Sequence, residues 1–554
     1  MKTIKSIVIS YQTDGYPTGD YALSFFIKTI SKSSLFILIF LSFNTPSYSQ
    51  NQEQYNYLNK AKELINNQDL PEAIKILKEL EKENPQDLDI IQLYSQALYW
   101  NQDFDATLAL YKKSMKSFPH SAELKLHFGR IHFELNNFFE AKKLLASYIE
   151  VQPEDPEAGI LLATIAYWEG KPPQVALEFL DEVLEHHPEN PEAKALMKEI
   201  LISTAPNLRL SSSYYSDSQP LQAMINTVEY SNYQSSWLQP SVMFQNRNFK
   251  QADPTLLIQL SNKAFFSKSG TELIMRAGLF KDSWHNEFSP TYGFDLRQRL
   301  VEKWSLSGGI DRRPYVFTLS SLNQNLMPTT YSAGLGRQSD LWSGNISVNH
   351  TQFQDDNYVR VGTASLIFAV IKSSSLKVNL GYGYMMADSK ESRFRLADPF
   401  YAYVHETEIG TQFPGIFDPY FTPQNQSVHS VISDISFNIS PKVQVYLYGN
   451  IGFKAVIDNP NVIFYGSSDP SHYIDPAEQA DPNNLAPIEA HRIHPKDIYR
   501  VLFATEYFPM DLKGSLNWNM TKKLNLKTEY AYQRAVFFDS HMVSLGLNWN
   551  LSNE

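Results

Sequence analysis

The chain has 554 residues, more than one ordinary hydrophobic core organises, so at least two structural units are expected. Its 0 cysteines exclude disulfides, thiolate metal sites, cysteine nucleophiles and a lipid-modified N-terminal cysteine. Aromatic residues make up 13% of the chain, yet the mean hydropathy is -0.33 and the formal net charge is -11, which together exclude a bundle of membrane-spanning helices and disfavour a nucleic-acid partner.

Residues 1–49 are predicted to be a signal peptide. The apolar run at residues 34–43 is half as long as the roughly 20 residues that a membrane-spanning helix needs, and two lysines precede it. Small residues, Ser47 and Ser49, stand at the -3 and -1 positions of a cut after Ser49. We therefore expect cleavage before Gln50, and we interpret residues 1–27 as an over-extended gene start.

Residues 51–203 are rich in Leu, Ala, Glu and Lys, and they repeat with a period of 34 or 35 residues. A proline closes each unit, and a small residue that lets two helices approach closely stands twelve positions before it. The prolines are Pro85, Pro119, Pro153 and Pro188, and the small residues are Ala73, Thr107, Ala141 and Ala176. The pattern resembles tetratricopeptide repeats, with about four units followed by a capping helix at residues 191–202. An unrelated antiparallel helical bundle is the alternative.

The repeat region is acidic. Residues 51–203 hold 26 Asp and Glu against 15 Lys and Arg, whereas the part of the chain that follows is nearly neutral. An acidic surface of this kind would repel nucleic acid and anionic polymers and could bind a basic protein or a cationic glycan. The simpler interpretation is a solvated helix surface without a partner.

Residues 205–554 alternate between apolar and polar residues with a period of two. Examples are Val543, Leu545, Leu547, Trp549 and Leu551, and also Leu376, Val378, Leu380, Tyr382 and Tyr384. Such alternation, with aromatics near the strand ends, predicts an antiparallel transmembrane β-barrel of about sixteen strands, with 14 to 18 defensible. A soluble all-β sandwich or propeller is the alternative. The fold class expected for the whole chain is therefore multidomain, an all-α repeat solenoid followed by a barrel.

Most connections between the predicted strands are short. Two of them, at roughly 387–425 and 457–510, are too long to be hairpin turns and are expected to form external loops or lumen plugs. In the second of these loops, His491 and His494 stand near Asp497, but no fourth ligand follows at a fixed spacing, so no metal site is predicted. Phosphate-cradling and catalytic motifs are also absent from the sequence, so neither a cofactor nor an enzyme activity is expected.

The first long loop is rich in aromatic residues, and carboxylate and amide side chains lie between them. Aromatic rings stack on the flat apolar faces of sugar rings as they do on bases, so this loop is a candidate polysaccharide-binding segment. The candidate residues are Tyr401, Tyr403, Phe417, Asp418, Tyr420, Phe421 and Gln424. An equally good alternative is a loop pinned by prolines whose aromatics pack into the barrel mouth.

Residues 420–424 read Tyr-Phe-Thr-Pro-Gln and run directly into a predicted strand. The segment resembles the Tyr-Phe-Ser-Pro-Gln segment in the C-terminal domain of cellulose synthase operon protein C. The resemblance to that family, which includes the poly-N-acetylglucosamine porin, implies periplasmic repeats joined to an exopolysaccharide export barrel of sixteen strands. Residues 209–233 resemble YaiO-type outer-membrane proteins, which are the second choice.

The expected function is a passive outer-membrane conduit for a polysaccharide, with the repeats in the periplasm docking synthase or glycan-modifying proteins. The barrel would contact outer-membrane lipid, and nucleic acid is not an expected partner. The alternative is a YaiO-type anchor or scaffold whose repeats recruit a periplasmic partner. The residues that would line the glycan path are the aromatics of the first long loop.

Overall fold

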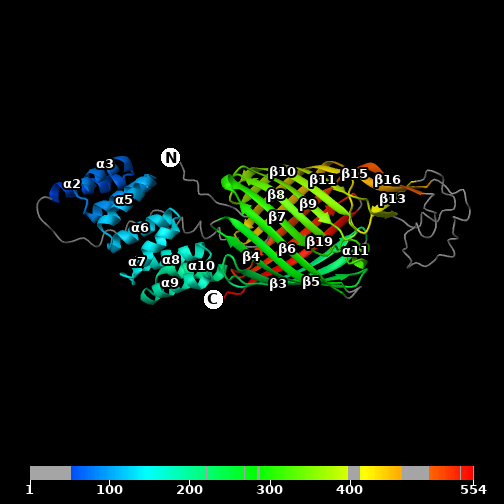
Figure 1. The fold of residues 1–554 in the computed structure, drawn as a ribbon, viewed down its shortest axis with the longest axis horizontal. Coiled ribbons are helices and arrows are strands. Elements are labelled where there is room, and N and C mark those ends of the chain that lie inside the picture. The colour runs from blue at the N-terminus through cyan, green and yellow to red at the C-terminus, as the bar shows by residue number, and fades with distance from the viewer. Residues whose placement is uncertain are drawn as a thin grey trace, which may run out of the picture. The chain divides into compact units, whose positions relative to one another are not determined.

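The computed structural model describes residues 51–219, 221–267, 269–282, 287–396, 412–464, 498–536 and 538–552. The predicted signal peptide, the aromatic pair Tyr401 and Tyr403, and the histidines of the second long loop lie outside these ranges. The chain divides into two compact units at Thr204 and Ala205. Each unit is described by itself (Figure 1).

The first unit is an array of antiparallel helix pairs, with nine helices among its described residues. They are α2 (Asn51–Asn66), α3 (Leu70–Glu83), α4 (Leu88–Trp100), α5 (Phe104–Ser117), α6 (Ala122–Glu134), α7 (Phe138–Ile149), α8 (Pro156–Trp168), α9 (Pro173–His186) and α10 (Pro191–Ser203). The first eight form four pairs, and α10 follows as a single helix packed on α9. Across the described residues, no helix combines the length and apolarity needed to cross a membrane.

Local sequence explains where these helices begin and end. Short polar side chains at the N-caps accept hydrogen bonds from backbone N–H groups that have no partner within the helix. Asp87, for example, accepts from the backbone N–H groups of Asp89 and Ile90. The turn inside each pair places one residue in the left-handed region. These residues recur at a spacing of 34 and are Gln68, Gln102, Asn136 and Gly170, with φ of 63°, 64°, 57° and 69°.

The small residues of the repeat lie at the contact between paired helices. Ala73, Thr107 and Ala141 are completely buried, and Ala176 is 1% exposed. A larger side chain at these positions would separate the two helices of a pair and open the core. The four prolines follow the ends of α3, α5, α7 and α9, where a missing backbone N–H interrupts no helical hydrogen bond.

The second unit is one antiparallel sheet closed on itself. Its named strands are β1 (Asn207–Asp217), β2 (Gln222–Ser231), β3 (Gln239–Phe249), β4 (Thr255–Phe266), β5 (Thr271–Lys281), β6 (Phe288–Arg299), β7 (Trp304–Arg312), β8 (Thr329–Gln338), β9 (Trp342–Gln352), β10 (Tyr358–Lys372), β11 (Leu376–Ser389), β12 (Phe394–Leu396), β13 (Gln412–Phe417), β14 (Gln426–Ser440), β15 (Val443–Phe464), β16 (Ile498–Tyr507), β17 (Met510–Asn519), β18 (Leu524–Arg534) and β19 (Asp539–Asn550). Neighbouring strands of the wall pair with one another, and β19 pairs with β1, so the wall closes on itself (Figure 1).

The barrel wall has sixteen strands in the described part of the chain, as predicted. Two relationships reduce the nineteen named strands to this number. β16 and β17 are two halves of one strand interrupted near Pro509, since both pair with the long β15. β12 and β13 are short and pair with each other, and β13 also pairs with the far end of β15, beyond the wall itself.

Apolar side chains cover the outside of the barrel. In β9, Ile346 and Val348 are 60% and 52% exposed, whereas Ser347 between them forms a hydrogen bond to Thr363 of β10 inside the wall. The same alternation continues around the wall, for example at Val543 and Leu545 of β19. A protein in water would not expose such a belt, whereas a wall that separates lipid from a wet lumen requires it.

The structure changes two predictions about loops. The second long loop is shorter than 457–510, because β15 continues to Phe464 and its partner strand begins at Ile498. The sequence pattern also does not predict a further long connection, residues 313–328, between β7 and β8. This connection contains the short helix α11 (Leu319–Asn323), and we call it the inner loop.

Candidate functional site in the barrel lumen

The two ends of the barrel differ in the length of their connections. The chain enters β1 and leaves β19 at the end that carries short turns, such as those joining β8 to β9 and β14 to β15. The opposite end carries the inner loop, the connection between β11 and β14, and the connection between β15 and β16. In transmembrane barrels, the end with short turns faces the periplasm and the long loops lie outside.

The inner loop folds into the barrel mouth. Its side chains Val316, Leu322 and Met327 form one buried cluster with Phe280 of β5 and Leu221. Partly buried residues of the cluster occupy lumen-facing positions of β1, β3 and β4, and they include Tyr215, Phe249 and Leu257. The inner loop therefore packs against the inside of the wall.

Tyr420 joins the inner loop to the segment that precedes β14. Its ring is 1% exposed and packs with Phe353, Val359 and Leu326. The neighbouring backbone is held as well, because the Thr318 hydroxyl donates to the Pro419 carbonyl at 2.6 Å. Two loops at this mouth therefore contact each other.

A charged network surrounds the Tyr420 hydroxyl. The hydroxyl donates to the carboxylate of Asp355, with distances of 2.8 and 2.7 Å to its two oxygens, and Arg393 pairs with the same carboxylate at 3.1 Å. Burial opposes ionisation of Asp355, but the bonds from Tyr420, Asn357 and Arg393 outweigh it and lower the pKa of Asp355. Burial and the adjacent carboxylate raise the pKa of Tyr420, so its proton stays on the hydroxyl.

The other residues of the Tyr-Phe-Thr-Pro-Gln segment also have structural partners. Thr422 is fully buried, and its hydroxyl accepts the backbone N–H of Arg393 at 2.8 Å. The Gln424 amide donates to the carbonyl and hydroxyl oxygens of Ser389, at 2.8 and 2.6 Å. The segment therefore fastens the end of the connection to the rim of β11.

The remaining predicted binding residues of the first long loop lie beside this segment. Phe417 is 2% exposed and meets Phe421 edge-on, with ring centroids 5.0 Å apart. Asp418 pairs with Arg395 at 3.1 Å. The rings of Phe417 and Tyr420 are covered by protein, as in the alternative of aromatics packed into the mouth. Polysaccharide binding by Phe417, Asp418, Tyr420, Phe421 and Gln424 stays a prediction, as it does for Tyr401 and Tyr403.

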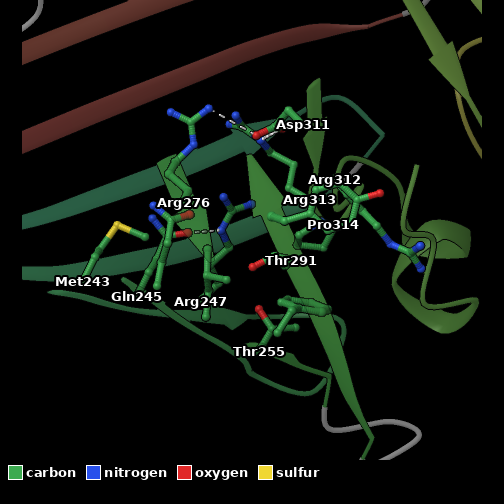
Figure 2. Close-up of a pocket in the computed structure, with 14 residues that line it drawn as sticks. Met243, Gln245, Arg247, Thr255, Arg276, Thr291, Asp311, Arg312, Arg313 and Pro314 are labelled. Carbon is green, nitrogen blue, oxygen red and sulfur yellow. Dashed lines mark hydrogen bonds and ion pairs between the residues drawn. The ribbon is translucent and has the colours of Figure 1, made fainter. Parts of the chain in front are cut away.

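Beneath the inner loop lies a pocket of about 310 Å³ in the lumen wall (Figure 2). It is lined from β3 to β7 and by the first residues of the inner loop. Four of its lining residues are arginines, Arg247, Arg276, Arg312 and Arg313, whereas its one acidic lining residue is Asp311. Among the described residues that form this pocket, cationic groups thus outnumber acidic ones.

The strand register explains how Arg276 enters the pocket. Arg276, Gly293 and Asp311 lie directly opposite one another on β5, β6 and β7. A Cβ atom at Gly293 would come within 2.7 Å of the Arg276 Nε and 2.9 Å of an Asp311 oxygen. The glycine therefore leaves the space through which Arg276 reaches Asp295 and Asp311.

A second part of the lumen is uncharged. Across the described strands, no charged residue faces the lumen from β8, from β9, or from β10 before its bulge near Ala369. Hydroxyl, amide and glycine positions line most of this surface, together with the apolar Val359, Val361 and Ile367 of β10, and we call it the uncharged wall. It includes Ser332, Gly334, Gly336, Asn345, Ser347, Asn349, Thr363 and Ser365.

The repeats carry polar contacts between neighbouring units. Arg130 of α6 forms two hydrogen bonds with Glu157 of α8, at 2.5 and 2.6 Å. The Ser95 hydroxyl lies 2.5 Å from Nε2 of His127. Burial, together with the nearby charge of Arg130, lowers the pKa of His127 to about 3, so its ring is neutral.

The sequence interpretation did not identify the arginine pocket. Its side chains come from five successive strands, and which of them meet depends on the register of these strands. The run Asp311-Arg312-Arg313-Pro314 at the end of a strand was the one available signal. Three consecutive residues of this run are charged, whereas a strand of alternating pattern carries an apolar residue at every second position.

Comparisons with known proteins find two kinds of similarity. Residues 101–165 match the family model of a tetratricopeptide repeat. The structure is similar to a "Bacterial polysaccharide outer membrane secretin", with 10% identity, a TM-score of 0.43, and coverage of 63% of this chain and 99% of that chain. It is also similar to PilF of Pseudomonas aeruginosa, with 16% identity, a TM-score of 0.25, and coverage of 27% and 69%. The search of curated proteins found no match.

Proposed function

We propose that the chain is an outer-membrane conduit for export of an exopolysaccharide, with its repeats in the periplasm docking synthase or glycan-modifying proteins. The observation that carries the proposal is the uncharged wall. Its hydroxyl and amide groups can exchange hydrogen bonds with sugar hydroxyls along the lumen, and no single strong contact would hold a moving chain. The conduit performs no chemistry itself, and synthesis supplies the energy for transport.

The two barrel ends support a direction for this transport. β1 begins at the end with short turns, which is the periplasmic end of transmembrane barrels, and the repeats directly precede β1 in the chain. The inner loop and the Tyr420 segment pack together at the opposite mouth. A glycan would therefore enter from the periplasm and displace these loops as it leaves, so we assign the Tyr420 segment a gating role.

Deletion of the gene tests the proposal. We expect surface glycan to fall and the same glycan to accumulate in the periplasm, and expression of the full chain to restore export. A chain with Ser347→Trp, which narrows the lumen, should reach the outer membrane but restore several-fold less surface glycan than the unmodified chain. Unchanged surface glycan in the deletion strain would contradict the proposal.

The second candidate is a scaffold in which the barrel is only an anchor. The observation that favours it is the acidity of the repeats, whose 26 acidic and 15 basic residues suit a basic partner protein. Affinity purification of the full chain distinguishes the two. Glycan synthase and glycan-modifying enzymes are the partners expected for a conduit, whereas envelope-assembly components would support the scaffold.

A further inference from the structure

The arginines of the lumen pocket are only partly neutralised by the protein. Among the described residues, no carboxylate lies within ion-pair distance of Arg247, whose Nε donates to the neutral amide oxygen of Gln245 at 3.1 Å. Arg313 and Arg276 share Asp311, and Arg276 also pairs with Asp295. In Figure 2, the Arg247, Arg276 and Arg313 side chains converge on one side of the pocket.

Two buried donors that face the pocket also have no hydrogen-bond partner among the described residues. They are the Nε atom of Arg276 and the hydroxyl oxygen of Thr291. Leaving such a group without a partner costs free energy, and the cost is larger for a charged group than for a neutral one. A ligand with oxygen acceptors would supply the missing partners.

The rest of the lining indicates the shape of that ligand. Met243, Leu257 and Phe280 provide apolar surface, while Gln259, Thr255 and Thr291 provide polar groups. Such a mixture suits a sugar ring, whose C–H face packs on apolar atoms while its hydroxyls form hydrogen bonds. The volume of about 310 Å³ is at the small end of the range for ligand pockets.

We infer that this pocket binds an acidic sugar residue, with the guanidinium groups of Arg247, Arg276 and Arg313 around its carboxylate and the polar lining at its hydroxyls. The inference rests on the proposed conduit and gives its substrate a class, a polysaccharide that carries carboxylate groups. The acidic repeats would repel such a chain, so their role in this conduit is to dock partner proteins and not to bind the glycan. Guanidinium groups match a carboxylate in geometry and charge. An uncharged glycan has no carboxylate and could not form these ion pairs. The pocket would then be a binding step directly beneath the inner loop.

Calorimetric titration of the purified full-length protein in detergent tests the inference. The probes are trigalacturonate and its methyl ester, which differ in the charge of the carboxyl groups. We expect the acid to bind and the ester to bind at least tenfold more weakly. Arg247→Gln should weaken binding of the acid about tenfold or more, since it removes charged hydrogen bonds. Arg247→Lys should weaken it less, because the positive charge remains.

Arg297→Gln is the matched control. Arg297 also faces the lumen, but it lies opposite Glu272 near the other end of β6. The control should bind the acid as the unmodified protein does, and circular dichroism should report the same fold for every variant. Equal binding of acid and ester, or unchanged binding after Arg247→Gln, would overturn the inference. Competition by inorganic sulfate at the same concentration as the trisaccharide would also overturn it, because it would show ion binding without sugar recognition.

The outcome is independent of the deletion experiment. Binding of the acid in detergent with unchanged surface glycan in the deletion strain would contradict the conduit and leave the pocket in place. Loss of surface glycan without binding of the acid would contradict the pocket and leave the conduit in place.

Discussion

The ring of Tyr420 lies flat on the ring of Phe353, with centroids 3.6 Å apart and an angle of 5° between the planes. Phe353 follows β9, and Tyr420 precedes β14, so the stack joins two connections at the same mouth of the barrel. The inner loop contacts the same pair through Tyr315, whose ring meets both edge-on. One buried tyrosine therefore contacts two other connections at this mouth.

Tyr420→Ala should open the mouth. It removes the stack on Phe353 and the hydrogen bonds to Asp355, and truncation of a buried aromatic ring costs about 3–5 kcal/mol. We expect a higher single-channel conductance in planar bilayers than for the unmodified protein. Tyr420→Phe keeps the ring and should give an intermediate conductance. Tyr331→Ala, on the outer face of β8, is the control, and equal conductance of all four proteins would contradict the gating role.

Ser347→Trp should obstruct export, because Ser347 faces the lumen from the middle of β9 and the indole ring fills space that a glycan needs. Ile346→Trp is its matched control, since Ile346 is 60% exposed on the outer face. Surface glycan measured in the complemented deletion strain should fall several-fold for the first variant and stay unchanged for the second. An equal effect of both variants would contradict the assignment of the lumen face.

Gly170→Ala should destabilise the repeats by about 1 kcal/mol. Gly170 has a φ of 69°, where a residue with a Cβ is strained. Gln102 occupies the same turn position two units earlier, with a φ of 64°. Gln102→Gly should relieve the backbone strain there, but a glycine also loses more chain entropy on folding. The free energy of unfolding should therefore rise by less than about 1 kcal/mol. Urea unfolding of the full-length protein, followed by the helical circular-dichroism signal, measures both. A loss of stability in Gln102→Gly would contradict this account of the turn.

The repeats should lose stability as the pH falls from about 6.5 toward 3. The pKa of His127 is about 3 in the folded protein and lies near its ordinary value in the unfolded chain, so the unfolded chain binds a proton in this window and the folded protein does not. The neutral His127 contributes its full stabilisation above about pH 6.5. Below that pH, the free energy of unfolding of the repeats falls by up to about 1.4 kcal/mol for each pH unit.

His127→Gln removes the titrating ring and should flatten this dependence. Urea unfolding of the repeats at pH 7, 6 and 5 compares the two proteins. An identical pH dependence would show that another group is responsible. His186 is exposed at the end of α9, so His186→Gln serves as the control and should leave the dependence unchanged.

The fold was predictable because both parts repeat a simple pattern. Pro85 and Pro119 mark a period of 34 residues, and the alternation that includes Val543 and Leu545 continues across the barrel. These signals are local, so they need no knowledge of which strands pair. The closure of β19 on β1 then follows, because a membrane barrel cannot leave an edge strand exposed to lipid.

The site was less predictable because it depends on contacts between distant segments. The composition of the first long loop predicted a polysaccharide-binding segment. It could not predict that Tyr420 is buried against Phe353, which lies 67 positions earlier in the sequence. The arginine pocket needs the register of β3 to β7, and the inner loop has no compositional feature that distinguishes it from a surface connection. Single-sequence patterns carry no information on such pairings.

The most direct test of the conduit is photo-crosslinking in living cells that produce the glycan. A photoreactive amino acid is placed in turn at Ser347, which faces the lumen, and at Ile346, which faces outward. The account predicts a slowly migrating adduct, removable by a hydrolase specific for the glycan, from position 347 and none from position 346. Absence of the adduct at position 347, or equal adducts at both positions, would contradict passage of the glycan through the lumen.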